Sequence, residues 1–196
     1  MSGIDSSTAL WYASRATGLV ALVLLSAAMV LGITVIRQGR LPGLPRFAVT
    51  GLHRNLSLLA LVFTIVHVLS AVADSYVSIP LAATVVPFVS GYEGFALGLG
   101  AITLDLMIAM IVTSLLRGRM NPKLWRAIHW LAYLSWPVGV VHSLLASEDL
   151  RGGWELAITV ACIVAVGVAA GWRVVAAAKA TPRAERVSAL MTKGQR

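Results

Sequence analysis

Charged residues are scarce in this sequence. Asp, Glu, Lys and Arg make up 12% of the 196 residues, whereas hydrophobic residues make up 58%. The mean hydropathy of the chain is +0.84. Because a soluble domain carries roughly 25% charged residues, this composition excludes an ordinary soluble protein. It indicates a chain whose main solvent is lipid.

Cysteine is almost absent, since Cys162 is the only one. A single thiol excludes an internal disulfide framework, a Cys-x-x-Cys-His haem attachment and a cysteine-ligated iron–sulfur cluster. Acidic residues are also few: 8 Asp and Glu stand against 16 Lys and Arg, for a net charge of +8. The basic residues lie between apolar runs rather than along one polar face. We therefore expect no nucleic-acid partner, and we expect the charge to orient the chain in a membrane of lipid.

Five segments are apolar over the length that a membrane crossing requires, about 20 residues. They cover roughly residues 11–36, 48–73, 94–116, 125–147 and 154–178. The uncharged stretch 16–36 is longer than the apolar region of a signal peptide, and residues 1–10 before it contain no Lys or Arg. We therefore predict an all-α, polytopic membrane bundle of five transmembrane helices. Its membrane domain covers 11–178, between an outer segment 1–10 and a basic cytoplasmic tail 179–196.

The basic residues predict the orientation of this bundle. Fourteen of the 16 Lys and Arg fall on one side, in the 37–46 and 117–126 regions, at Arg54 and near the C-terminus. By the positive-inside rule, the N-terminus lies outside and the C-terminus is cytoplasmic. In the outer segment 74–93, the apolar stretch Val77–Val89 is too short to span and is broken by two prolines. We expect it to lie at the surface or to dip in and cap the outer face of the bundle.

The four histidines all fall inside predicted spans. His53 and His67 lie on the second span, and His129 and His142 lie on the fourth, at separations of fourteen and thirteen positions. These two spans run parallel, so the histidines form a cytoplasmic-side pair and an outer pair, about 20 Å apart along each helix. Because imidazole is a common haem ligand, we predict two haem b groups, one held by His53 with His129 and one by His67 with His142. Two imidazoles per iron leave no open position, which favours electron transfer.

The direction in which each histidine points around its helix axis bears on this prediction. A separation of fourteen positions returns to within about 40° of the starting direction, so the histidines of the second span share a face with Ser57, Ala60 and Thr64. A separation of thirteen leaves the histidines of the fourth span about 140° apart in an ideal helix. Pro137 lies between them and can kink or rewind the helix. The alternative is that the histidines only form hydrogen bonds between helices.

The residues around the histidines resemble the ferric reductase-like transmembrane domain, which is shared with NADPH oxidases and the haem subunit of the bacterial methionine sulfoxide reductase system. The similar segments are Gly51-Leu-His-Arg-Asn-Leu-Ser, Val66-His-Val, Trp125-Arg-Ala-Ile-His-Trp and Val141-His-Ser. The resemblance covers about residues 10–178, with five spans where many relatives have six. It implies the same two haem pairs. Because only the short tail 179–196 follows the last span, we expect electrons from a separate flavoprotein reductase or from a quinol.

Three arginines are further candidates for cofactor binding. Arg15, Arg54 and Arg126 lie near the predicted histidine levels, and arginine pairs well with carboxylates such as haem propionates. For Arg54 and Arg126, anchoring at the membrane interface is an equal alternative. Arg15 is distinctive because it lies on the outer side, where basic residues are few. Asp105, in the middle of the third span, is expected to orient a histidine, to relay protons or to bond a neighbouring helix.

These observations predict a di-haem b transmembrane electron-transfer protein, an oxidoreductase component of the ferric reductase-like kind. It passes electrons to an external electron acceptor: a ferric chelate, oxygen or a partner reductase. We expect it as a multi-pass protein of the cell membrane, in a bacterial plasma membrane. One alternative is a haem-binding subunit that feeds a partner reductase. The other is a haem-free membrane scaffold or transporter, in which the histidines are dispensable.

Overall fold

The computed structural model describes residues 6–36, 45–75, 77–146 and 153–178, and within these ranges it contains helices and turns but no strand. The helices are α1 (Ser6–Ile36), α2 (Arg46–Ala73), η1 (Leu81–Thr84), α3 (Gly94–Leu115), η2 (Arg117–Arg119), α4 (Pro122–His129), α5 (Ala132–Ala146) and α6 (Trp154–Ala178). The predicted tail 179–196, residues 1–5 and most of the 37–46 loop lie outside the described residues.

Four of the five predicted spans are confirmed as single helices. The segments Thr8–Thr34, Phe47–Ala73, Gly94–Leu115 and Trp154–Ala178 are each long and apolar enough to cross a membrane. Helices are the form that such segments must take, because lipid offers no partner for an unpaired backbone N–H or C=O. The chain is therefore a multi-pass membrane protein.

The predicted span 125–147 is not one helix, and this part of the prediction is wrong. A break at residues 130 and 131 separates α4 from α5. With 15 residues, α5 is about 22 Å long at about 1.5 Å per residue, which is short of the roughly 30 Å hydrocarbon core. A crossing here requires both helices. His129 consequently ends α4, and His142 belongs to α5.

The break also accounts for the rotation problem of this segment. Backbone N–H groups of Leu131, Tyr133 and Leu134 each bond a carbonyl three residues earlier, at 2.9, 3.1 and 3.0 Å. Such 3₁₀ winding advances about 120° per residue instead of about 100°. A short stretch of it reduces the roughly 140° by which the two histidines miss a shared face in an ideal helix. The rewinding therefore lies at the break and not at Pro137, which is inside α5.

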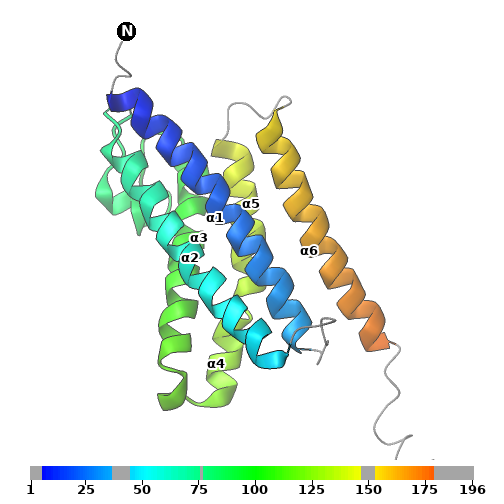
Figure 1. The fold of residues 1–196 in the computed structure, drawn as a ribbon. Coiled ribbons are helices and arrows are strands. Elements are labelled where there is room, and N and C mark those ends of the chain that lie inside the picture. Colours follow the sequence, from blue (N-terminus) through cyan, green and yellow to red (C-terminus); the bar gives the residue numbers. More distant parts are fainter. Residues whose placement is uncertain (1–5, 37–44, 76, 147–152, 179–196) are drawn as a thin grey trace, which may run out of the picture.

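Figure 1 shows which of the long helices pack side by side. Helix α1 lies along α2, α3 lies along α5, and α6 packs against the other side of α1. The start of α1 and the end of α6 lie at opposite ends of the bundle (Figure 1). Within the described ranges, α2 and α5 make no extensive contact of their own. These two helices carry three of the four histidines, so the histidines bridge a space between them.

Small side chains fill much of the interior. The buried alanines are Ala21, Ala28, Ala60, Ala83, Ala96, Ala101 and Ala169. Membrane helices associate by close van der Waals packing, and small residues let their backbones approach. Close approach also brings the backbone carbonyls of one helix within reach of side chains on the next.

The segment 77–93, which precedes α3, packs onto one end of the bundle. Its short helix η1 contacts α3 and buries Ala83. Phe88 has a left-handed backbone (φ 67°) and stacks on Phe95 of α3 with ring centroids 6.0 Å apart. Ile79, Ala83 and Thr84 line the cavity described below. The segment therefore covers one end of the bundle, and the assignment of this end to the outer face stays a prediction.

Candidate functional site

The four histidines lie in two pairs. The rings of His53 and His129 have centroids 6.2 Å apart and planes at 72°. The rings of His67 and His142 also have centroids 6.2 Å apart, at 70°. We call these the inner pair and the outer pair, and their members are the partners that the sequence predicted. Each pair joins α2 to the segment formed by α4 and α5.

This separation fits one metal ion between two imidazoles. A metal–imidazole bond is about 2.0 Å long, and the ring centre lies about 1.1 Å from the nitrogen, given ring bonds of roughly 1.3–1.4 Å. Two such ligands place their ring centres about 6 Å apart. No group of three or more His, Cys, Asp or Glu that suits a metal ion exists among the described residues. At each pair, the described residues therefore offer such an ion two imidazoles, and a macrocycle would supply further ligands.

Three of the histidines are held by backbone carbonyls of neighbouring helices. The Nδ1 atoms of His53, His67 and His142 bond the carbonyl oxygens of Ala28, Ser14 and Ala96, at 2.8, 2.7 and 2.8 Å. A carbonyl oxygen can only accept, so Nδ1 must carry the proton and donate it. The lone pair of each ring is then on Nε2, which is the form that a metal ligand needs. The neighbouring helices thus select both the ring orientation and the tautomer.

A glycine follows each of these carbonyls by one helical turn. A methyl group at Gly100 would come within 2.8 Å of His142 Cε1, and one at Gly18 within 2.9 Å of His67 Nδ1. At Gly32 the distance to His53 Cε1 would be 3.3 Å. Because residue i+4 of a helix lies one turn above the carbonyl of residue i, carbonyl and glycine form one surface. We call each such surface, which consists of Ser14 with Gly18, Ala28 with Gly32, or Ala96 with Gly100, a histidine seat.

The seats have a signature in the sequence that hydropathy and histidine spacing do not reveal. The two seats on α1 begin at Ser14 and Ala28, and they have the same spacing along the chain as His53 and His67 on α2. Since α1 and α2 are neighbours in an antiparallel hairpin, equal spacing lets both histidines meet α1 in the same way. The recurrence of a small residue followed four positions later by glycine is the pattern that would have revealed them.

His129 is held differently. Its Nδ1 is buried and has no hydrogen-bond partner among the described residues. Its ring stacks on Trp125, with centroids 5.1 Å apart and an angle of 22°. The guanidinium carbon of Arg117 lies 4.3 Å from the centre of the Trp125 ring. The indole N–H donates to Ser114 Oγ at 3.4 Å. The inner pair therefore has one seated ring and one stacked ring.

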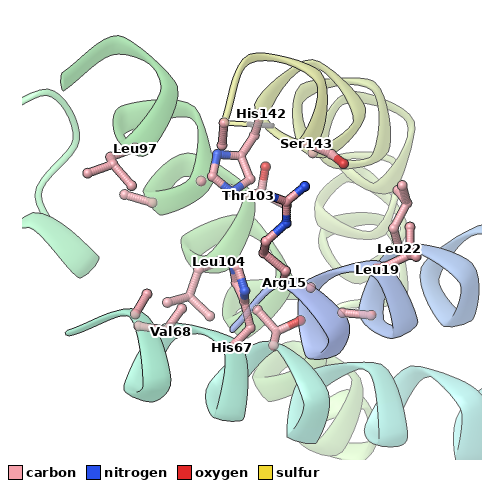
Figure 2. A pocket seen from close by; sticks show the side chains of 18 of the residues that line it. Arg15, Leu19, Leu22, His67, Val68, Leu97, Thr103, Leu104, His142 and Ser143 are labelled. Atoms are coloured by element: carbon pink, nitrogen blue, oxygen red, sulfur yellow. The ribbon is translucent and has the colours of Figure 1, made fainter. Parts of the chain in front are cut away.

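A cavity of about 200 Å³ contains the outer pair. Its lining comes from all the long helices and from η1, and it is mainly apolar. Figure 2 shows the side chains of His67 and His142 converging on this space, with Arg15 among the lining residues. An apolar cavity with two convergent imidazoles is the type of environment that suits a mostly apolar cofactor.

The structure separates the three candidate arginines. Arg15 lines the outer cavity, and its guanidinium donates to Glu155 Oε2 of α6 at 2.8 Å. Glu155 also lines the cavity, and the sequence analysis did not single it out. Arg54 and Arg126 are exposed, and Arg126 Nε donates to the carbonyl of Pro122 at 3.1 Å. Neither is hydrogen-bonded to a histidine in the described part of the chain.

A layer of side chains lies between the two histidine levels. Trp136 stands between His129 and His142 in the sequence, and its indole N–H donates to the buried Ser26 Oγ of α1 at 2.9 Å. Ala60, midway between the histidines of α2, is fully buried. Asp105 makes no hydrogen bond with a histidine in the described ranges. Backbone carbonyls orient three of the rings instead, and the role of Asp105 stays a prediction.

The chain matches a known protein family. Residues 17–140, more than half of the chain, match the model of the ferric reductase like transmembrane component. The match includes three of the four histidines, and His142 lies just beyond it. Neither the curated proteins nor the solved structures give a match. Domains of this kind generally bind haem and point to electron transfer across a membrane. The chain belongs to the ferric reductase-like transmembrane family.

Proposed function

We propose that this chain is a di-haem b transmembrane electron-transfer protein that passes electrons from a cytoplasmic-side donor to an external acceptor. The observation that carries the proposal is the presence of two histidine pairs, each with ring centroids 6.2 Å apart, at two levels of one membrane bundle. The family supports transmembrane electron transfer in general. The pairs supply what a chain of two redox centres requires.

The two imidazoles of each pair would hold a b-type haem, which would supply an iron that gains and loses one electron. The chain's own part is to present the ligands. The carbonyls of Ser14, Ala28 and Ala96 keep Nδ1 protonated and Nε2 available, and such a second hydrogen bond also raises the basicity of a ligating imidazole. The ligands therefore need little rearrangement when the cofactor binds.

The spacing of the levels suits a crossing. Along α2, His53 and His67 are separated by about 20 Å, out of a hydrocarbon core of about 30 Å. Trp136, Ser26 and Ala60 occupy the layer between the levels. Each pair consequently lies nearer to one face of the membrane.

The inner pair lies at the end that we assign to the cytoplasm. Exposed basic side chains surround this end at Arg117, Arg119, Lys123 and Arg126, as the positive-inside rule requires. The donor is a separate flavoprotein reductase or a quinol, and the acceptor is a ferric chelate, oxygen or a partner reductase. The haem domain covers residues 11–178, in a bacterial plasma membrane. A subunit that passes electrons to a partner reductase would use the same two histidine pairs and differ only in its electron acceptor.

The test is a pyridine haemochrome assay on the detergent-purified protein. We expect about two haems b per chain in the wild type and about one in His67→Ala, because that variant removes one ligand of the outer pair. Cys162→Ala is the control, since Cys162 is buried in α6 and does not line the cavity. The control should keep both haems.

Two results would contradict the proposal. A wild-type protein that stays colourless after haem-replete expression would favour a haem-free scaffold or transporter. Two haems that persist in both His67→Ala and His53→Ala would show that the histidine pairs are not the ligands.

A further inference from the structure

We propose that Trp125 is the positioning residue of His129. Because the stack between these two rings holds the ligand in place, loss of the stack lets the inner site release its haem. The inference rests on the proposed function, because it presumes that the inner pair binds a haem. It concerns an asymmetry that the sequence does not show. Three ligand rings are seated on other helices, and the fourth is held by a side chain of its own short helix.

Among the described residues, His129 lacks the backbone hydrogen bond that holds the other three histidine rings. His53, His67 and His142 each have Nδ1 bonded to a carbonyl on another helix. The Nδ1 of His129 is buried but bonded to nothing in the described part of the chain. No glycine described in the structure lies against its ring either. Without a hydrogen bond to select the tautomer and the ring orientation, packing must do so.

The ring of Trp125 packs against His129. Trp125 precedes it by about one helical turn, so both rings lie on one face of α4. They are stacked at 5.1 Å and 22°. The guanidinium carbon of Arg117 lies 4.3 Å from the centre of the Trp125 ring. The indole N–H reaches Ser114 Oγ at the end of α3.

Helix α4, which carries His129, has little stability of its own. Helix α4 has 8 residues, and a helix this short is not stable alone. Most of its side chains are exposed, and α3 is the helix that it contacts most. Trp125 connects α4 to Ser114 and Arg117, at the corner between α3 and η2. It thus links the ligand to the rest of the bundle.

The consequence is specific to one haem. Loss of the Trp125 ring frees the rotation of His129 and loosens α4, whereas the outer ligands keep their seats on α1 and α3. From the usual strength of aromatic pairs, we expect about 2- to 13-fold faster release of one haem. Release of the other haem should not change.

The experiment follows transfer of haem from the detergent-solubilised holoprotein to an excess of a haem-scavenging apoglobin. The variants are Trp125→Ala, which removes the ring, and Trp125→Phe, which keeps an aromatic stack. Trp154→Ala is the matched control, because Trp154 is 67% exposed at the start of α6. We expect one accelerated phase in Trp125→Ala, less than a twofold change in Trp125→Phe, and wild-type release in the control.

Trp125→Leu gives the same comparison with an apolar side chain if Trp125→Ala does not accumulate. A second readout is the low-spin ferric electron paramagnetic resonance spectrum, in which the signal of one haem should shift and the other should stay. Wild-type release in both Trp125→Ala and Trp125→Leu, or equal acceleration of both haems, would overturn the inference. A wild-type protein with no haem at the inner pair would instead refute the proposed function.

Discussion

Gly100→Ala is the sharpest test of the histidine seats. Gly100 lies on α3 against the ring of His142, and an added methyl carbon would be 2.8 Å from Cε1, 3.1 Å from Nδ1 and 3.2 Å from Nε2. Ordinary van der Waals contact begins at 3.4 Å. The ring must therefore move by several tenths of an ångström. Movement away from α3 lengthens its 2.8 Å hydrogen bond to the Ala96 carbonyl, one turn below on the same helix.

The magnitude follows from the cost of overpacking. An extra methyl group in a well-packed interior costs about 1–3 kcal/mol. If the whole cost falls on the ligand geometry, the outer haem binds about 5- to 150-fold more weakly, at about 1.4 kcal/mol per tenfold. The inner haem should be unaffected, because Gly100 does not contact either histidine of the inner pair.

The assay is equilibrium haem titration of the depleted protein, with graded variants. Gly18→Ala should weaken the outer haem by a similar factor, because its methyl carbon would be 2.9 Å from His67. Gly32→Ala should have a smaller effect, on the inner haem, because the distance to His53 is 3.3 Å.

Gly167→Ala is the matched control. It lies inside α6, where an added methyl carbon meets nothing within 4 Å. Alanine favours a helix over glycine by up to about 1 kcal/mol, so this variant should be at least as stable as the wild type and bind both haems normally. Unchanged affinity for the outer haem in Gly100→Ala would refute the seats.

Two further predictions concern stability, measured by thermal unfolding in detergent. Glu155→Gln removes the charge that pairs with Arg15 at 2.8 Å and should cost about 1 kcal/mol, because the pair is only partly exposed. A loss no larger than in Glu93→Gln, an exposed acid, would contradict this. Trp136→Phe removes the indole N–H bond to Ser26 and should cost about 0.5–1.5 kcal/mol. Trp154→Phe serves as its control, and equal stability of the two would contradict the prediction.

The membrane bundle was predictable because the bilayer constrains composition so strongly. A crossing helix needs about 20 apolar residues in a row, and four such runs became the four long helices. The segment 125–147 misled the prediction for the same reason. Its apolar content suited a span, but hydropathy does not report winding, and the 3₁₀ bonds at Leu131, Tyr133 and Leu134 interrupt it.

The candidate site was likewise predictable from the sequence only in part. The spacing of the two histidines on each span, with alternating topology, was enough to predict which histidines meet, because depth in a membrane follows residue number along a helix. Arg15 lines the cavity of the outer pair, and its role toward a cofactor stays a prediction. The grouping of Arg54 and Arg126 with it is not supported by a contact with the inner histidines in the described residues.

By itself, the sequence determined that this protein lies in a membrane, where its long helices are, and at which two depths the histidines lie. These depend on local composition and on distance along one helix. Only the tertiary structure decided how each ring is held, because that depends on pairs such as Ser14 with His67 that are far apart in the sequence. Close packing of α1 on α2 and of α3 on α5 creates the seats. His129 of α4 has no such seat among the described residues, and its ring stacks on Trp125 instead.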